Sequence, residues 1–287
     1  MENKGLTATF VFQASSLNYG EGIGNQAVLK KVTMADGKTY ARVSRQALLY
    51  NVREQLPSGY LATLDQDASD KSVVQYSPSA TVKDYPEIDL FGYMKTTKGS
   101  GGVKRSAVAR LSDGIALTPF SNDEDFLTNM GLAKRLAKQI GSEVKNSIAS
   151  SEISNDYYRY TLCVDLDNIG IDDNDGIEIA NGEKAKRVNS LLDTINNLYR
   201  DIRGRREDLH PIFAIGGIYD VKRPFFENAI KVHDNNLEVN ATAPEGTSVG
   251  IDEGYFDNEE QYFSCDNTDV DDWFSRIEND VSDYYAE

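Results

Sequence analysis

Apolar and polar side chains alternate over residues 6–14, and this pattern predicts a half-buried β-strand. A helix is expected over residues 44–55, because Ser44 suits the N-cap position and Pro57 follows the last helical turn. Residues 107–117 predict a further strand with a turn at its Asp-Gly pair. The first half of the chain therefore runs strand, helix, strand.

The second half repeats this order. Residues 158–166 are rich in strand-forming side chains, and residues 183–203 carry one apolar stripe at helical spacing. Gly204 is a typical helix-ending residue, and residues 212–215 predict the next strand. Two strand-helix-strand units form the split βαβ, or ferredoxin-like, pattern that RNA-recognition (RRM) domains share. We therefore expect an α+β fold of this kind.

Two insertions interrupt this pattern, one within the first unit and one between the two units. In the first, residues 60–87 are polar and irregular, and residues 88–94 predict a short apolar strand that runs into a basic, glycine-rich loop. The second covers residues 119–156 and includes a helix expected over about 126–140. Lys134, Arg135 and Lys138 share one face of that helix, which by pattern alone indicates a solvated surface.

The net charge of −16 comes mainly from the C-terminal residues 250–287, which carry 13 acids and one base. The other 249 residues carry 33 acids and 29 bases, and their cations are clustered. Residues 30–53 hold six cations and one acid, and residues 95–110 hold five cations and no acid. Such stripes favour binding to a phosphate backbone. No apolar run is long enough to span a bilayer, no signal-peptide core is visible, and two cysteines form no framework, so we expect a cytoplasmic protein without membrane contact.

Catalytic and metal-binding patterns are weak. The two histidines, His210 and His233, have no cysteine or carboxylate at ligand spacing. The glycines between Gly20 and Gly24 do not have dinucleotide-binding spacing, and they indicate either a phosphate-binding turn or a structural bend. The acidic run 165–176 has a glycine where a calcium loop needs its bidentate glutamate, which leaves weak magnesium binding as an alternative. We expect neither a cofactor nor a metal centre.

Several segments in sequence order resemble one protein family. They are Phe12 to Asn25, Lys30-Lys31, Ser44 to Leu48, Asp89 to Met94, Arg105 to Ala107 and Tyr157 to Gly170. Together they resemble the DevR-type backbone subunit of type I-B CRISPR surveillance complexes (Cascade), from about Leu6 to Gly217. The resemblance implies a palm with finger and thumb insertions. The implied parts are 1–59 (first palm half), 60–104 (finger and basic loop), 105–118 (palm strand), 119–156 (thumb), 157–249 (second palm half) and 250–287 (acidic tail).

The same resemblance implies a non-catalytic protein that stacks head-to-tail with copies of itself along one CRISPR RNA. Its other implied partners are further Cascade subunits and target DNA, which pairs with the guide. Arg45 is a strong candidate for phosphate binding, because it lies in the first turn of its helix, where the dipole favours an anion. Met94 is ambiguous, because it suits a core position or insertion between bases. The predicted RNA-binding residues are Asn18, Tyr19, Gly20, Ser44, Arg45, Gln46, Met94, Lys98, Lys104, Arg105 and Arg135.

Two other functions compete with this one. A nuclease like the type III backbone subunits would need an aspartate in the early loop, which offers Glu21 but no aspartate before Asp36. A freestanding RNA-binding regulator would act on chosen sequences without polymerising. The acidic tail carries an apolar helical stripe over residues 273–284, which could cap the palm, dock on a basic neighbour or keep free subunits off other RNA.

Overall fold

The fold is organised around one antiparallel sheet. The computed structural model describes residues 2–22, 24–66, 73–96, 102–263 and 269–286. The long strands β1 and β13 lie side by side at the centre of the sheet and pair over eleven residues, from Gly5 opposite Asp165 to Ser15 opposite Asn155. In order, the sheet contains β21 (Ser248–Ile251), β18 (Phe213–Tyr219), β1 (Gly5–Ser15), β13 (Asn155–Asp165), β10 (Gly114–Ala116), β4 (Thr39–Val43) and β3 (Lys31–Thr33), and β9 (Ala109–Leu111) also pairs with β13.

The predicted strands over residues 6–14, 158–166 and 212–215 are confirmed by β1, β13 and β18. The expected strand over 107–117 is present as two short strands, β9 and β10. On β1, Leu6, Ala8, Phe10 and Phe12 all enter the main core, whereas Val11 joins a second core on the opposite face. Alternation therefore places one core on each side of the sheet, and the overall class is α+β.

Three helices cover the main-core face of the sheet: α1 (Arg45–Gln55), α4 (Asn181–Asn196) and α5 (Val270–Ala286). The predicted helix over 44–55 is thus confirmed, although the Ser44 side chain makes no capping hydrogen bond. The apolar stripe of the acidic tail forms the buried side of α5, where Trp273 and Phe274 pack against Phe10 with ring centroids 5.7 and 5.5 Å away. Of the three roles considered for the tail, the structure shows packing against the sheet.

The prediction of one helix over 183–203 is wrong at its C-terminal end. Helix α4 ends at Asn196, and β16 (Tyr199–Ile202) and β17 (Arg205–Asp208) form a hairpin that turns at Gly204, whose φ is +78°. The Gln55 side chain hydrogen bonds to the backbone of Tyr199 at both its oxygen (2.7 Å) and its nitrogen (3.2 Å). This tertiary contact overrides the helical periodicity that continues through the sequence.

The strand predicted over 88–94 is wrong for residues 88–91 and is confirmed only at Tyr93 and Met94. Residues Pro86–Phe91 form α2, with proline at its first turn, and the strand β7 (Tyr93–Lys95) begins only after Gly92. Gly92 has a φ of +72°, and a Cβ there would lie 2.5 Å from the Arg105 carbonyl oxygen. The short apolar run was ambiguous between helix and strand, and this glycine turn ends the helix.

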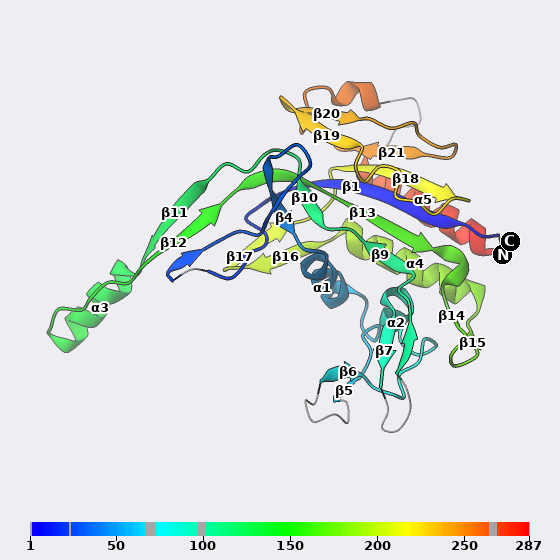
Figure 1. The fold of residues 1–287 in the computed structure, drawn as a ribbon, viewed down its shortest axis with the longest axis horizontal. Coiled ribbons are helices and arrows are strands. Elements are labelled where there is room, and N and C mark those ends of the chain that lie inside the picture. Colours follow the sequence, from blue (N-terminus) through cyan, green and yellow to red (C-terminus); the bar gives the residue numbers. More distant parts are fainter. Residues whose placement is uncertain (1, 23, 67–72, 97–101, 264–268, 287) are drawn as a thin grey trace.

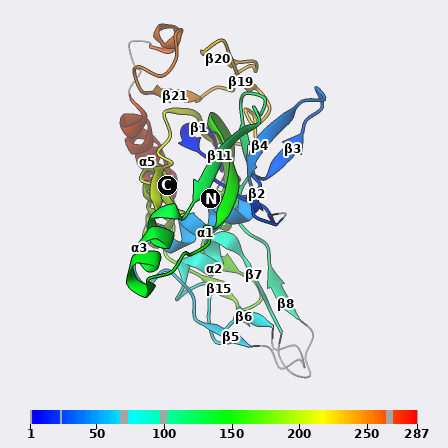
Figure 2. The same cartoon turned by 90° about the vertical axis from the view of Figure 1, so that its left-hand side faces the viewer.

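Two extensions leave the sheet in different directions (Figures 1 and 2). The first, called the arm here, is a ribbon of β11 (Asp123–Thr128) and β12 (Ile148–Ile153) that ends in α3 (Met130–Ile140). The helix expected from about 126 therefore begins at Met130, because residues 126–128 pair with β12. The second, called the lower insertion, contains α2 and the hairpins β5 (Leu64–Gln66) with β6 (Val74–Tyr76) and β7 with β8 (Val103–Arg105).

The remaining elements are short. They are β2 (Gln26–Ala27), η1 (Leu166–Asn168), β14 (Ile171–Asp172), β15 (Ile177–Glu178), β19 (Ile230–His233), β20 (Asn236–Val239) and η2 (Glu259–Tyr262). The β19–β20 hairpin covers part of the second core, and the two chain ends lie together at one side of the sheet (Figure 1). Among the described residues, no helix has the length and apolarity needed to cross a membrane.

Candidate nucleic-acid interface

The loop after β1 meets the N-terminus of α1. The Asn18 amide donates to the Ser44 hydroxyl at 3.1 Å, and both residues are buried. The backbone N–H of Arg45 donates to the Asp113 carboxylate at 2.6 Å, and Arg42 forms an ion pair with the same carboxylate at 2.9 Å. The anion favoured at this helix N-terminus is thus supplied by the protein itself.

The side chains of Arg45 and Gln46 remain accessible beside this junction. Gln46 is exposed, and Arg45 is half-buried with no hydrogen bond or ion pair from its guanidinium to any described residue. Arg45 therefore keeps its donors available for an external phosphate. Asn18, Ser44, Arg45 and Gln46 thus lie at one junction, and their contact with RNA stays a prediction.

Tyr19 is held at the base of the arm. Its ring lies 3.6 Å from the Arg203 guanidinium carbon, and its hydroxyl accepts a 3.3 Å hydrogen bond from Ser151 on β12. Arg203 also donates to the Ser151 hydroxyl at 2.7 Å. Arg203 was not predicted as a site residue, because residues 183–203 were expected to form one helix. In the structure Arg203 lies in the turn between β16 and β17.

The Gly20 loop forms a short two-stranded turn. The N–H of Gly20 donates to the Val28 carbonyl at 2.7 Å, and Gly24 has a φ of +62°. A Cβ at Gly22 would lie 2.4 Å from the Gln26 carbonyl oxygen. Gly22 therefore has no room for a side chain, and Gly24 has a backbone conformation that favours glycine. Both observations favour the structural bend. Gly20 itself is exposed.

On the lower insertion, Met94 and Lys104 face each other across β7 and β8. Met94 is 66% exposed, and the exposed Lys104 side chain makes no hydrogen bond or ion pair with a described residue. Lys98 lies outside the described residues. This hairpin therefore presents an apolar side chain beside a free cation.

Arg105 points inward instead. Its guanidinium donates to the Asp89 carboxylate at 2.8 Å, to the carbonyl oxygens of Ile171 at 2.9 Å and Asn168 at 3.0 Å, and to the carbonyl oxygens of Ile88 and Asp89. These contacts use all five N–H donors of an arginine. No donor is left for phosphate, so the predicted RNA contact of Arg105 has no support in this geometry.

Asp89 explains why Arg105 is held so firmly. Its carboxylate is fully buried and also accepts hydrogen bonds from Arg187 at 2.9 Å and from the Gly170 N–H at 2.9 and 3.0 Å. Arg187 lies on α4, so this carboxylate ties the lower insertion to the helix layer. A buried charge needs such partners, because its transfer from water costs several kcal/mol.

Several cations counted in the basic stretch 30–53 are also paired internally. Lys31 contacts Glu152 at 2.6 Å, and Arg53 contacts Glu87 at 3.4 Å. Together with the Arg42 pair, these contacts remove half of the six cations from the exposed charge of the stretch. The charge count along the sequence therefore overstated the cations available to a ligand.

Arg135, another predicted RNA-binding residue, lies on α3 at the end of the arm, far from the α1 junction and the β7–β8 hairpin (Figure 1). Its side chain is exposed and makes no ion pair with a described residue. The apolar side of this helix is exposed as well, at Leu132 (62%) and Ile140 (56%). The predicted residues thus occupy three separate surfaces: the α1 junction, the β7–β8 hairpin and the tip of the arm.

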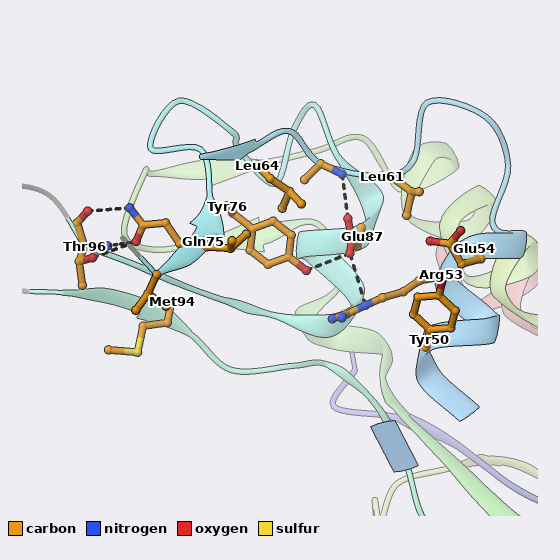
Figure 3. A pocket seen from close by; sticks show the side chains of 13 residues that line it. Tyr50, Arg53, Glu54, Leu61, Leu64, Gln75, Tyr76, Glu87, Met94 and Thr96 are labelled. Atoms are coloured by element: carbon orange, nitrogen blue, oxygen red, sulfur yellow. Dashed lines mark hydrogen bonds and ion pairs between the residues drawn. The ribbon is translucent and has the colours of Figure 1, made fainter. Parts of the chain in front are cut away.

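A cavity of about 610 Å³ lies between α1 and the lower insertion (Figure 3). Glu87 organises it by accepting hydrogen bonds from the Ala62 N–H at 2.8 Å and the Tyr76 hydroxyl at 2.9 Å. Burial raises the pKa of Tyr76 to about 12, so this hydroxyl stays protonated. Exposed Leu64 and Met94 form part of the apolar wall. The sequence did not predict this cavity, because residues 60–87 were expected to be irregular.

Among the described residues, no group of three or more histidine, cysteine, aspartate or glutamate side chains could hold a metal ion. In the acidic run 165–176, Asp172 accepts hydrogen bonds from the Tyr93 hydroxyl at 2.8 Å and the Asn174 N–H at 3.0 Å. Asp165 instead pairs with Arg110 at 2.7 Å. These carboxylates thus serve different contacts and do not converge.

The model of one protein family, the CRISPR-associated negative auto-regulator DevR/Csa2, matches residues 6–240. The chain belongs to the DevR/Csa2 family. A search of curated proteins finds no match for this DevR/Csa2 chain.

Solved structures share the fold of the DevR/Csa2 chain. A chain described as "CRISPR RNA-guided surveillance complex, pre-nicking" aligns with a TM-score of 0.65 and 11% identity, covering 97% of this chain and 99% of that one. A second, described as "CRISPR RNA-guided surveillance complex", aligns with a TM-score of 0.57 and 12% identity, covering 98% and 99%. At such identities the likeness shows the fold alone.

Proposed function

We propose that this DevR/Csa2 chain is a non-catalytic backbone subunit of a type I-B Cascade complex, which binds CRISPR RNA and stacks head-to-tail with further copies of itself. Other Cascade subunits would attach to this backbone, and the held guide would pair with target DNA. The observation that carries the proposal is the whole-length likeness to two chains of CRISPR RNA-guided surveillance complexes, together with family membership. Both alignments cover nearly all of each chain, so the insertions are included with the central sheet.

In this proposal the central sheet is a ferredoxin-like palm. Its supporting observation is the order β18, β1, β13, β10, with α1 and α4 on one face, which is the order expected from two split βαβ units. The arm would then be the thumb and the lower insertion the finger.

The cations that keep free donors would grip the ribose-phosphate chain. Arg45 at the α1 junction, Lys104 on β8 and Arg135 on α3 each lack an internal ion pair among the described residues. Phosphate contacts carry no sequence information, which suits a protein that must hold any guide and leave recognition to base pairing. Tyr19, Gly20 and Gln46 would line the same path, and Asn18 and Ser44, which are buried and bonded to each other, would hold it in shape. Lys98 would add charge, and Met94 would contact a base. Arg105 would act by holding the finger in place.

A second candidate function follows from the description of the family as a negative auto-regulator. A freestanding regulator would bind chosen sequences as a small particle. Binding to one guide RNA by many copies, without sequence preference, would separate the backbone subunit from this regulator.

The decisive experiment is expression of the chain with its neighbouring genes and a CRISPR array, followed by purification and sequencing of the bound nucleic acid. The proposal expects array-derived RNA of a single length in a large assembly. A small particle free of RNA, with the array present, would refute it. Guide-programmed cutting of complementary RNA that stops on metal chelation would instead indicate a nuclease.

The phosphate grip is tested separately by Arg45→Ala, with Arg276→Ala as the control. Arg276 is an exposed cation on α5, in the helix layer and away from the α1 junction. Arg45→Ala should weaken binding equally for unrelated RNA sequences and reduce the slope of log affinity against log salt by about 0.7, as expected for one lost contact to a single strand. An unchanged slope would remove Arg45 from the site.

A further inference from the structure

The hairpin of β16 and β17 lies where α1 and the arm approach each other. Gln55, the last residue of α1, hydrogen bonds to the backbone of Tyr199 on β16, and Arg203 in the hairpin turn donates to Ser151 on the arm. Figure 1 shows the hairpin between α1 and the arm. None of the residues predicted to bind RNA lies on it. The hairpin is therefore an additional surface beside the α1 junction.

Arg203 has a backbone conformation that arginine seldom takes. Ile202 pairs with Arg205 across the hairpin, so Arg203 and Gly204 form a two-residue turn. Both turn residues have positive φ, +49° for Arg203 and +78° for Gly204. Turns of this kind favour asparagine or glycine, because a larger side chain is disfavoured at positive φ. The local conformation thus gives no reason for an arginine here, and its side-chain contacts supply one.

The guanidinium of Arg203 lies over the ring of Tyr19, with its central carbon 3.6 Å from the ring centroid. This is the contact distance of two stacked planar groups, so Tyr19 covers one face of the guanidinium. The one hydrogen bond from the guanidinium to a described residue reaches the Ser151 hydroxyl at 2.7 Å, and no described carboxylate pairs with it. Arg203 is exposed, so its outer face and most of its donors remain available.

A second arginine on the same hairpin shows the contrast. The guanidinium carbon of Arg206 lies 4.1 Å from the ring centroid of Tyr199, but its Nε and Nη2 both donate to the Asp201 carboxylate at 2.8 Å. These two bonds neutralise the charge and occupy the fork that an external group would need. The stack of Arg206 is therefore completed within the chain, whereas the stack of Arg203 has one open side.

The position and chemistry of the open side indicate an RNA base. Asn18, the residue before Tyr19, donates to Ser44 at 3.1 Å, so the stack adjoins the α1 junction. Arg45 keeps free donors for phosphate at that junction. Unpaired RNA bases stack on arginine planes as well as on aromatic rings, and such stacking accepts every base. A phosphate alone would use the in-plane donors of Arg203 and leave its open face unused.

We propose that the outer face of the Arg203 guanidinium stacks on a nucleobase of bound RNA, with Tyr19 as the support beneath it. The proposal rests on the proposed function, in that RNA occupies the α1 junction. It adds a base contact on the hairpin side of this junction, separate from Met94 on the lower insertion. Because Ser151 on the arm fixes the guanidinium, the arm also sets where this base lies.

The test compares two ligands of equal length, each short enough to bind a single copy. One is an RNA, and the other is a chain of stable abasic ribonucleotides, which keeps every ribose and phosphate but has no bases. Arg203→Lys retains the charge but not the plane, so it should bind the RNA about tenfold more weakly than wild type and the abasic chain within about twofold of wild type. Wild-type affinity of Arg203→Lys for the RNA, or equal losses on both ligands, would overturn the proposal.

Arg206→Lys is the matched control, because it changes an arginine-on-tyrosine stack of the same hairpin whose donors are already used. It should bind both ligands as wild type does, and a loss on RNA as large as that of Arg203→Lys would contradict the assignment. Thermal unfolding of Arg203→Lys should show the wild-type midpoint, since the residue is exposed and lysine can take the same turn conformation. A lowered midpoint with equal losses on both ligands would give Arg203 a structural role only.

Binding by the wild type separates this proposal from the proposed function. Wild type that binds the RNA and the abasic chain equally well would refute the stacking contact alone, because no base would then contribute to affinity. Wild type that binds the RNA more tightly than the abasic chain, with Arg203→Lys reducing that difference, supports the contact. Wild type that binds neither ligand would refute the proposed function and the stacking contact with it.

Discussion

Lys104 and Arg105 are neighbours in sequence but should respond in opposite ways to replacement by alanine. Arg105→Ala removes one of the two guanidiniums that neutralise the fully buried Asp89 carboxylate, and it also frees carbonyl oxygens of α2 and of the segment that follows β13. Breaking a buried ion pair in this way costs about 3–5 kcal/mol. Lys104 is exposed, so its replacement should change the free energy of unfolding by no more than about 0.5 kcal/mol.

The assay is urea unfolding of both variants beside the wild type, followed by RNA binding at several salt concentrations. Arg105→Ala should lower the unfolding midpoint strongly, whereas Lys104→Ala should keep it. Lys104→Ala should instead reduce the salt slope of RNA binding by about 0.7. The two measurements together distinguish a side chain that holds the lower insertion from one that binds phosphate.

An Arg105→Ala variant that unfolds at the wild-type midpoint and loses salt slope would contradict these assignments. That result would mean that Arg105 leaves Asp89 when RNA arrives. Arg105→Lys is an informative second variant, because a lysine can retain the charge near Asp89 but cannot supply the fork of five donors. It should recover only part of the lost stability.

Two further predictions concern pH. The hydrogen bond to Asp252, together with the Asn196 carbonyl, raises the pKa of His210 to about 9, so the protonated ring should stabilise the fold fully below about pH 6.5. This contribution to the free energy of unfolding, about 1–2 kcal/mol after allowance for solvent, should be lost as pH rises through 9. Thermal unfolding scans at several pH values should show this loss in the wild type and not in His210→Ala. Burial, with the charge of Asp193, raises the pKa of Glu278 to about 7. The folded state therefore holds this proton more tightly than the unfolded state, and the free energy of unfolding should fall as pH rises from about 4.5 to 7. Glu278→Gln should therefore be more stable than wild type by about 1 kcal/mol at pH 8 and equal to it at pH 4, and equal stability at pH 8 would contradict the assignment.

The sequence alone was sufficient where local pattern and tertiary environment agree. The alternation in β1 and the apolar stripe of α5 correspond directly to buried faces, because a side chain that repeats with the period of its element must meet the same layer. The α1 boundaries followed from its flanking residues. The acids of the C-terminal segment lie on the exposed side of α5, whose apolar stripe enters the core.

Only the tertiary structure decided which charges are free. Arg105 and Arg45 look alike in the sequence, yet one is consumed by Asp89 and by carbonyl oxygens from distant segments, and the other keeps its donors. The hairpin after α4, which places Arg203 against Tyr19, likewise depends on a contact with Gln55. Ion pairs and backbone hydrogen bonds between residues far apart in the chain have no local signature, because each partner is chosen by the fold that brings it near.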